Sequence, residues 1–298
     1  MSALFGVELR RLLARRLFRL TTLLVVAMFV VGGVIVFFAS KTSPAEFEQA
    51  ASEREAVFES CINSQGFGVP SEEIEDLERF CREETAAISA DPRFDYGEMT
   101  DNLTGLAFPL LMLGWLLGAS FIGAEWHNRM LTMTLTWEPR RTRVLLAKAG
   151  ALALVVAVWI LVLEVLYAAA LYPAAAVNGI TDSVDTAFWR EMASIALRVD
   201  AMSVIAALLG FSLATIGRNT AAALGAGFAY LAVIEGLIRG FKPVWSRWLI
   251  GDNVGLFLVG ELNTMPGRSR ADAMALLLAY AAGFLALAVG FFRQREMT

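Results

Sequence analysis

Long uncharged, apolar runs alternate with charged segments along this chain of 298 residues. Between Arg19 and Lys41 there are 21 residues without a charge. At roughly 1.5 Å per residue, a helix of this length crosses the ~30 Å hydrocarbon core of a bilayer. A second such run lies between Asp101 and Glu125, and four more apolar runs begin after Lys148, Asp200, Arg218 and Asp272. The pattern predicts an all-α integral membrane protein with six transmembrane helices.

The boundaries of these runs predict a division of the whole chain. An amphipathic interfacial helix is expected at 1–19, and transmembrane helices at 20–40, 102–124, 148–172, 200–217, 219–238 and 272–292. The connecting segments are 41–101, 125–147, 173–199, 239–271 and the tail 293–298, with a tight turn expected near Arg218. The 239–271 segment contains tryptophans and glycines and is too broken to span, so we expect it to be interfacial or re-entrant.

The placement of basic residues indicates which side each segment faces. Segments on one side hold 13 Lys or Arg in 52 residues, and these are 1–19, 125–148, 217–219 and 293–298. Segments on the other side hold 12 in 121 residues, and these are 41–101, 173–199 and 239–271. Because cytoplasmic segments are richer in Lys and Arg, we expect both termini to be cytoplasmic.

The first outer segment, 41–101, is acidic and is predicted to contain a small helical domain. It holds 16 Asp or Glu against five Lys or Arg. Its Ser43-Pro44-Ala45-Glu46 run is typical of a helix start, and a second helix is expected around 74–81. Cys61 and Cys81, the only cysteines, lie one in each helical region on the oxidising side, so we expect a disulfide. The alternative is a pair of buried thiols.

The first 19 residues predict a helix that lies in the membrane interface. Apolar side chains share one broad helical face, namely Phe5, Leu9, Leu12, Leu13 and Leu17. Most of the arginines lie elsewhere, although Arg16 interrupts the apolar face. A basic amphipathic helix of this kind binds anionic lipid headgroups. The alternative is a basic flank that only sets topology.

Composition and absent motifs narrow the possible functions. The chain is 57% hydrophobic and 18% charged, whereas soluble domains are about 45–50% apolar. It has no G-x-x-x-x-G-K-[ST] phosphate loop, no H-E-x-x-H motif and no G-x-S-x-G motif, and His127 is its only histidine. We therefore expect no ATP hydrolysis, no catalytic or metal site, no cofactor and no nucleic-acid partner for this chain itself.

The inner segment 125–148 is the strongest candidate for a functional site. Apolar side chains are expected on two adjacent stripes of a short helix, with Met130, Met133 and Trp137 on one and Leu131 and Leu135 on the other. Glu138-Pro139 is expected to end this helix, because proline disfavours helical geometry in the residue before it. Such a helix fits a groove on another protein. The alternative is an interfacial loop that only fixes topology.

The same segment resembles a known family. Glu125, Leu131, Leu135 and the run Thr136-Trp137-Glu138-Pro139-Arg140-Arg141-x-Arg143-Val144-Leu145-x-Ala147-Lys148 are similar to the cytoplasmic segment after the second span in ABC-2-type transporter permeases. The six-span layout, the basic N-terminus and the large first outer loop are similar as well. The chain departs from the family pattern in the length and the cysteines of that loop, which puts its cargo and outer contacts in doubt.

The resemblance implies the permease subunit of an ATP-driven ABC exporter in a bacterial plasma membrane. Two copies, or this permease and a related one, would pair, and two separate ABC ATPase subunits holding ATP and Mg would bind beneath. The N-terminal helix would be the elbow, and the 125–148 segment would carry the coupling helix. The residues assigned to ATPase coupling are Glu125, Arg129, Met130, Leu131, Met133, Leu135, Trp137, Glu138, Pro139, Arg140, Arg141 and Arg143. Among them, Met130, Leu131, Met133 and Trp137 would contact the ATPase.

Two acidic residues fall inside predicted spans. Glu164 and Glu235 each lie ~24 Å along a helix from the inner boundary, which places them in the outer leaflet. An ionisable residue within a span is a functional candidate by default, here for the gating of cargo. The alternative is a structural role, with snorkelling to the outer interface or, for Glu235, an ion pair with Arg239 one turn further on.

The spans are rich in Ala, Leu, Val and Phe, which favours an amphipathic or hydrophobic cargo such as a drug, an antibiotic, a lipid or a peptide, moved outward. The alternative function is a membrane sensor or assembly protein that works through its acidic outer segment. An integral membrane enzyme is a weaker alternative, because the spans hold no cluster of catalytic residues.

A labelling experiment tests the predicted sides. In cells that carry Trp137→Cys, we expect a membrane-impermeant maleimide to react only after the cells are opened, because positive-inside placement puts this residue in the cytoplasm. Gln49→Cys should react in intact cells. Labelling of position 137 in intact cells would contradict the assignment.

Overall fold

The computed structural model describes residues 2–64, 77–86, 91–128, 130–260 and 265–294. Within these ranges the chain is helical throughout, apart from turns and an isolated bridge between Asp95 and Ile180. Six helical stretches are long and apolar enough to cross a membrane, namely Arg16–Ala39, Tyr96–Trp126, Arg141–Asn178, Thr186–Gly217, Thr220–Phe241 and Arg270–Gln294. The prediction of an all-α, multi-pass membrane protein is confirmed.

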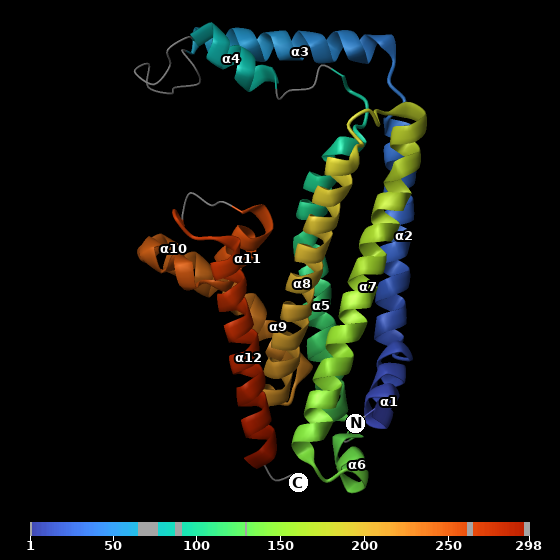
Figure 1. Cartoon of the computed structure of the whole chain (residues 1–298), viewed down its shortest axis with the longest axis vertical. Helices are drawn as coiled ribbons and strands as arrows, with labels where there is room; N and C mark the ends of the chain where they lie inside the picture. The colour runs from blue at the N-terminus through green and yellow to red at the C-terminus, as the bar shows by residue number, and fades with distance from the viewer. Residues whose placement is uncertain (1, 65–76, 87–90, 129, 261–264, 295–298) are drawn as a thin grey trace. The chain divides into compact units, whose positions relative to one another are not determined.

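Figure 1 shows the helices in chain order. They are α1 (Ser2–Leu13), α2 (Arg16–Ala39), α3 (Pro44–Asn63), α4 (Leu77–Ala86), η2 (Tyr96–Glu98), α5 (Met99–His127), α6 (Met130–Trp137), α7 (Arg141–Asn178), α8 (Thr186–Gly217), α9 (Thr220–Ala229), the π-helical turn η3 (Tyr230–Ile234), α10 (Glu235–Phe241), η4 (Pro243–Trp248), α11 (Ile250–Val259) and α12 (Arg270–Gln294).

The expected turn between the fourth and fifth spans has clear local causes. Arg218 takes a left-handed backbone conformation with φ of 53°, which ends α8. Asn219 then caps α9, because its Oδ1 accepts a hydrogen bond of 2.8 Å from the Ala221 N–H. The two spans therefore form a helical hairpin.

The chain divides into two compact units. Unit 1 comprises Met1–Ala27, Met99–Leu166 and Thr186–Thr298, and unit 2 comprises Met28–Glu98 and Tyr167–Asp185. Helices α2 and α7 each contribute residues to both units.

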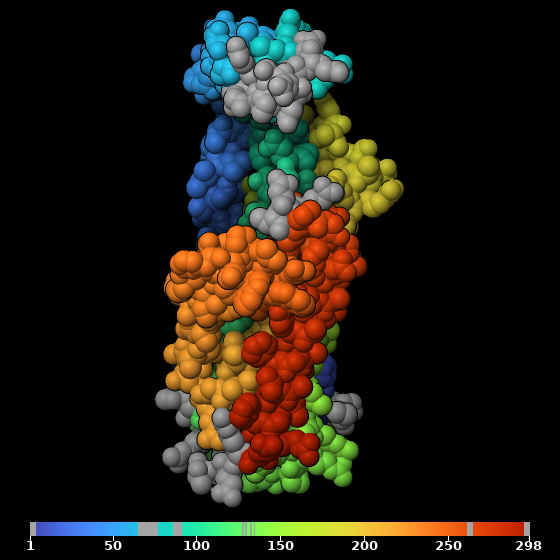
Figure 2. Space-filling model, turned by 90° about the vertical axis from the view of Figure 1, so that its left-hand side faces the viewer, coloured from blue at the N-terminus to red at the C-terminus, as the bar shows by residue number. Residues whose placement is uncertain are grey.

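In unit 1, α5 and α8 lie side by side along much of their length (Figure 1). Gly114 and Gly118 of α5 make this close approach possible, since a Cβ on either would meet a backbone carbonyl of α8, that of Ser203 or of Ala207. This small-xxx-small pair in the second predicted span is therefore a helix-packing site. On another face of the unit, α11 packs against α12, and both are visible in orange and red in Figure 2.

In unit 2, the C-terminal part of α2 pairs with the C-terminal part of α7. Gly33 allows close contact with the Ala170 backbone, and Asn178 Nδ2 donates a 3.0 Å hydrogen bond to the Phe37 carbonyl. Helix α7 continues past Tyr172 to Asn178, although it contains Pro173. The third apolar helix is thus longer than the 148–172 span that hydropathy predicted.

Helix α3 begins at Pro44 as predicted, and the Ser43 N–H donates to the Glu46 carboxylate. The Cys61–Cys81 disulfide is present and joins α3 to α4, with Cα atoms 5.7 Å apart. Ile74, which was expected to start the second helix, lies outside the described residues.

Three further regions differ from the expected division. The fourth apolar helix, expected at 200–217, begins at Thr186, so much of the 173–199 segment is helical. The segment 1–19 is not one helix, because α1 ends at Leu13 and α2 begins at Arg16. In the 239–271 segment, the fifth apolar helix reaches Phe241, and the short η4 and α11 follow.

Replacing both cysteines tests the role of the disulfide. In a Cys61→Ala, Cys81→Ala variant, the 20-residue separation predicts a loss of about 3 kcal/mol for the α3–α4 pair, because the unfolded loop is no longer constrained. We expect faster limited proteolysis within 41–98 and unchanged proteolysis of unit 1. Equal cleavage rates for variant and wild type would contradict this expectation.

Candidate functional site

A buried charge cluster lies at the end of unit 1 that carries α1 and α6 (Figure 1). Lys148 of α7 has no exposed surface, and its Nζ lies 2.6 Å from Glu8 Oε2 of α1. The same Nζ lies 2.8 Å from Oε2 and 3.1 Å from Oε1 of Glu125, at the end of α5. One ammonium group therefore joins three helices.

Arg15 extends this cluster from the break between α1 and α2. Its guanidinium lies 3.0 Å from Glu125 Oε1, donates to the Ser120 carbonyl at 3.0 Å, and stacks over the Phe121 ring. Burial lowers the pKa of the Arg15 guanidinium from its ordinary value, while the charges of Glu125 and Glu8 act to raise it. The break after Leu13 thus lets Arg15 turn toward α5, which a continuous interfacial helix would not do.

Without the surface residue Arg11, the cluster is balanced in charge. Two buried carboxylates, Glu8 and Glu125, face Lys148 and Arg15, and Arg11 adds an ion pair of 3.1 Å to Glu8 at the surface. Buried ion pairs contribute little net stability, but removing one partner leaves an uncompensated charge and costs about 3–5 kcal/mol. The cluster therefore fixes one arrangement of α1, α5 and α7.

Helix α6 presents an exposed apolar face beside this cluster. Met133 is 73% exposed and Trp137 is 91% exposed, and Met130 on the same stripe is 44% exposed. On the adjacent stripe, Leu131 is 1% exposed and Leu135 is half-buried. Leu131 thus anchors α6 within the chain, so it cannot contact a partner as expected from the sequence.

The connection from α6 to α7 places the remaining predicted residues. Helix α6 ends at Trp137, directly before Glu138 and the exposed Pro139. Arg140 and Arg143 are exposed, whereas Arg141 is half-buried and donates to the Phe292 and Arg293 carbonyls at the end of α12. Arg129 lies outside the described residues.

Glu235 occupies a second polar cluster in unit 1. It is 1% exposed, its Oε1 accepts from the Gly251 N–H at 2.8 Å, and its Oε2 lies 2.9 Å from Arg239. Arg239 also pairs with Asp252 at 2.8 Å. The expected ion pair between Glu235 and Arg239 is present, and the carboxylate also satisfies a donor in the first turn of α11.

Glu164 has different surroundings. It is 3% exposed, and neither of its carboxylate oxygens has a hydrogen-bond partner. Helix α7 continues beyond it as far as Asn178, so the side chain does not reach a helix end as the snorkelling alternative expected.

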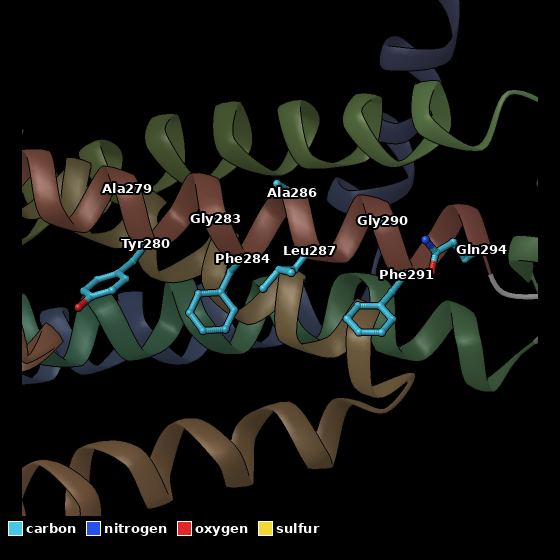
Figure 3. A pocket seen from close by; sticks show the side chains of 9 residues that line it. All are labelled: Ala279, Tyr280, Gly283, Phe284, Ala286, Leu287, Gly290, Phe291 and Gln294. Atoms are coloured by element: carbon cyan, nitrogen blue, oxygen red, sulfur yellow. The ribbon is translucent and has the colours of Figure 1, made fainter.

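Two apolar hollows lie in unit 1. One, of about 520 Å³, is lined by residues of α5, α8, α9, η3, α11 and α12, including Trp115, Tyr230 and Phe284. A second, of about 660 Å³, runs along α12, where Figure 3 shows Tyr280, Phe284 and Phe291 projecting from one side of the helix. The π-helical turn η3 contributes Tyr230 and Ile234 to the first hollow, and such turns often occur at functional sites.

The sequence analysis missed Glu8, placed Lys148 in the run that resembles the permease family, and counted Arg15 among the arginines of an interfacial helix. The signal for Glu8 was available, since it is the only acid before Glu46 and lies on the same helical stripe as Phe5 and Leu12. An acid on the apolar face of a basic helix requires a buried basic partner. Only the fold could identify Lys148 as that partner. Among the described residues no group of His, Cys, Asp and Glu is suited to hold a metal.

Substitution of Lys148 tests the cluster. We expect Lys148→Met to lower stability by about 3–5 kcal/mol, because Glu8 and Glu125 are left buried without a cation between them. Arg143→Met, at an exposed position on the same helix, should change stability by roughly 0.5 kcal/mol or less. The measurement is thermal unfolding in detergent, followed by size-exclusion chromatography.

A second substitution separates charge from packing. Adding Glu8→Gln to Lys148→Met should recover part of the lost stability, because it removes a buried carboxylate that only the partly exposed Arg11 would still pair with. If the double variant is less stable than Lys148→Met alone, charge compensation is not what this cluster provides.

No known protein-family model matches this chain, and no curated protein sequence matches it either. The case for a function therefore rests on the residues and geometry described above.

Proposed function

We propose that this protein is the membrane permease subunit of an ATP-driven ABC exporter, with α6 as the helix that receives the motion of a separate ATPase. The observation that carries the proposal is the exposed stripe of Met130, Met133 and Trp137 on a short helix. Exposed aromatic and methionine side chains in one stripe are typical of a protein-binding surface. No phosphate loop occurs in the chain, so energy for transport must come from a partner.

The buried charge cluster supports this role for α6. Helix α6 follows α5 by two residues and precedes α7 by three, and Glu125 and Lys148 tie these two helices together. A push on α6 would thus be passed to two membrane-spanning helices and, through Glu8, to α1. A rigid connection is what transmission of a conformational change requires.

The apolar hollows support an amphipathic or hydrophobic cargo. The hollow beside η3 is lined mainly by apolar and aromatic side chains. Pockets of this character bind ligands through apolar contact, with few polar groups to fix orientation. Both hollows lie in the same unit as α6.

The proposed assembly contains two permease chains, identical or related, and two ATPase subunits on the cytoplasmic side of a bacterial plasma membrane. In this arrangement, the positive-inside bias places α1, α6 and the end of α12 in the cytoplasm. ATP and Mg would be held by the ATPase, not by this chain.

Affinity purification in mild detergent tests the proposal. Wild-type protein should recover an ATPase with a phosphate loop. The Met133→Asp, Trp137→Asp variant should recover at least about tenfold less ATPase, because hot-spot residues contribute ~2 kcal/mol or more to the binding free energy. Recovered protein is identified by mass spectrometry and assayed for ATP hydrolysis.

The conservative variant Met133→Leu, Trp137→Phe is the matched control, since it keeps apolar side chains at both positions and should retain the ATPase. Insertion of all variants is checked by their amount in the membrane fraction. If wild-type protein is well expressed and recovers no ATPase, the exporter proposal is wrong, and a sensor that works through the acidic outer segment becomes the better one.

A further inference from the structure

Four glutamates are buried among the described residues of unit 1, and they differ in their partners; Glu8 contacts Lys148 and Arg11. Glu125 contacts Lys148 and Arg15, and Glu235 contacts Arg239 and the Gly251 N–H. Glu164 has neither a basic partner nor a hydrogen-bond donor for either carboxylate oxygen, although it is 3% exposed. Among the described residues it is therefore the one buried glutamate whose charge nothing compensates.

The charged group that acts on Glu164 is another acid. Asp200 of α8 interacts electrostatically with Glu164 of α7, and its Oδ1 is also buried without a hydrogen-bond partner. In the described part of the chain, no Lys, Arg or His forms an ion pair with either residue. The neighbouring Leu163 and Val199 are fully buried and apolar.

The two residues also occupy matching positions along their helices. Glu164 precedes Asn178, the last residue of α7, by the same number of residues as separate Asp200 from Thr186, the first residue of α8. Because the two helices are consecutive and joined by a short connection, this places the acids at a similar depth in the membrane. Both acids therefore lie within their helices and not at a helix end.

We propose that Glu164 and Asp200 form a proton-binding site between α7 and α8, with Glu164 held in its neutral, protonated form. A carboxylate buried without a partner is strongly disfavoured, and a second negative charge nearby disfavours it further. A proton removes both penalties and gives Glu164 an O–H donor. Among the described residues, no third His, Cys, Asp or Glu joins these two carboxyl groups to form a set that could hold a metal ion.

The site does not depend on the proposed exporter function, and it is tested on the full-length protein without knowledge of the cargo. The probe is dicyclohexylcarbodiimide, an apolar reagent that adds to protonated carboxyl groups and leaves a stable N-acylurea where water is scarce. Modified residues are identified by peptide mass spectrometry. We expect Glu164 to be modified at neutral pH, and its modification to fall about tenfold per pH unit once the carboxyl ionises.

Glu235 is an internal control in the same sample. It is as deeply buried as Glu164, but its carboxylate oxygens are engaged by Arg239 and by the Gly251 N–H. It should remain unmodified over the same pH range. Equal modification of Glu235 and Glu164 would show that the reagent reports burial alone, and would overturn the proposal.

Substitutions give two further readouts. Asp200→Asn removes the neighbouring negative charge, so the pH at which modification of Glu164 is lost should move lower. Glu164→Gln mimics the protonated form and should leave the melting temperature in detergent unchanged, whereas Glu235→Gln should lower it by breaking the contacts with Arg239.

Three results would overturn the proposal. The first is an unmodified Glu164 at all pH values at which the apolar reagent modifies other carboxyl groups. The second is a Glu164→Gln variant that loses as much stability as Glu235→Gln, which would mean that the ionised form is the native one. The third is modification that is insensitive to pH but prevented by Na⁺ or K⁺, which would identify a metal cation as the ligand instead of a proton.

Discussion

Lys148 lies between Glu8 and Glu125 with no exposed surface, and this contact joins α7 to α1 and α5. The two carboxylates are tolerated in an apolar environment because this ammonium group, together with Arg15 and Arg11, compensates their charge. The buried ammonium group is in turn compensated by the carboxylates. The arrangement of α1, α5 and α7 therefore depends on the pairing of Lys148 with Glu8 and Glu125. Apolar packing alone would allow these helices to slide or rotate against one another. The ion pairs of Lys148 with Glu8 and Glu125 form in only one register of α7 against α1 and α5.

The same constraint accounts for the position of α6. Leu131 is buried against the chain, while Met133 and Trp137 on the other side are exposed. Because α5 and α7 are held together by the cluster at their ends, α6 has a firm base from which to present these side chains. An apolar face displayed on such a base is suited to a protein partner, and a flexible loop with the same residues would lose more entropy on binding.

Buried acids elsewhere in unit 1 follow the same rule in different ways. The Glu235 carboxylate pairs with Arg239 and accepts a hydrogen bond from the first turn of α11, so it links α10 to α11. Glu164 is influenced by the charge of Asp200 and has no hydrogen-bond partner, so the proposed proton would remove the cost of burying its charge. Glu164 and Glu235 are about equally buried, so burial does not distinguish them. The difference is that Glu235 has a basic partner and Glu164 has none among the described residues.

The amino-acid sequence was sufficient to predict the six apolar helices, the helix start at Pro44, the turn at Arg218, the short helix before Pro139 and the two cysteines that pair. Each follows from a local rule of hydropathy, capping or backbone geometry. The folded chain was needed to learn that Gly118 packs against α8, that the N-terminal helix breaks before Arg15, and which base faces which acid. These features depend on contacts between segments that are far apart in the chain, and a periodicity within one segment holds no information about its neighbour across the bundle.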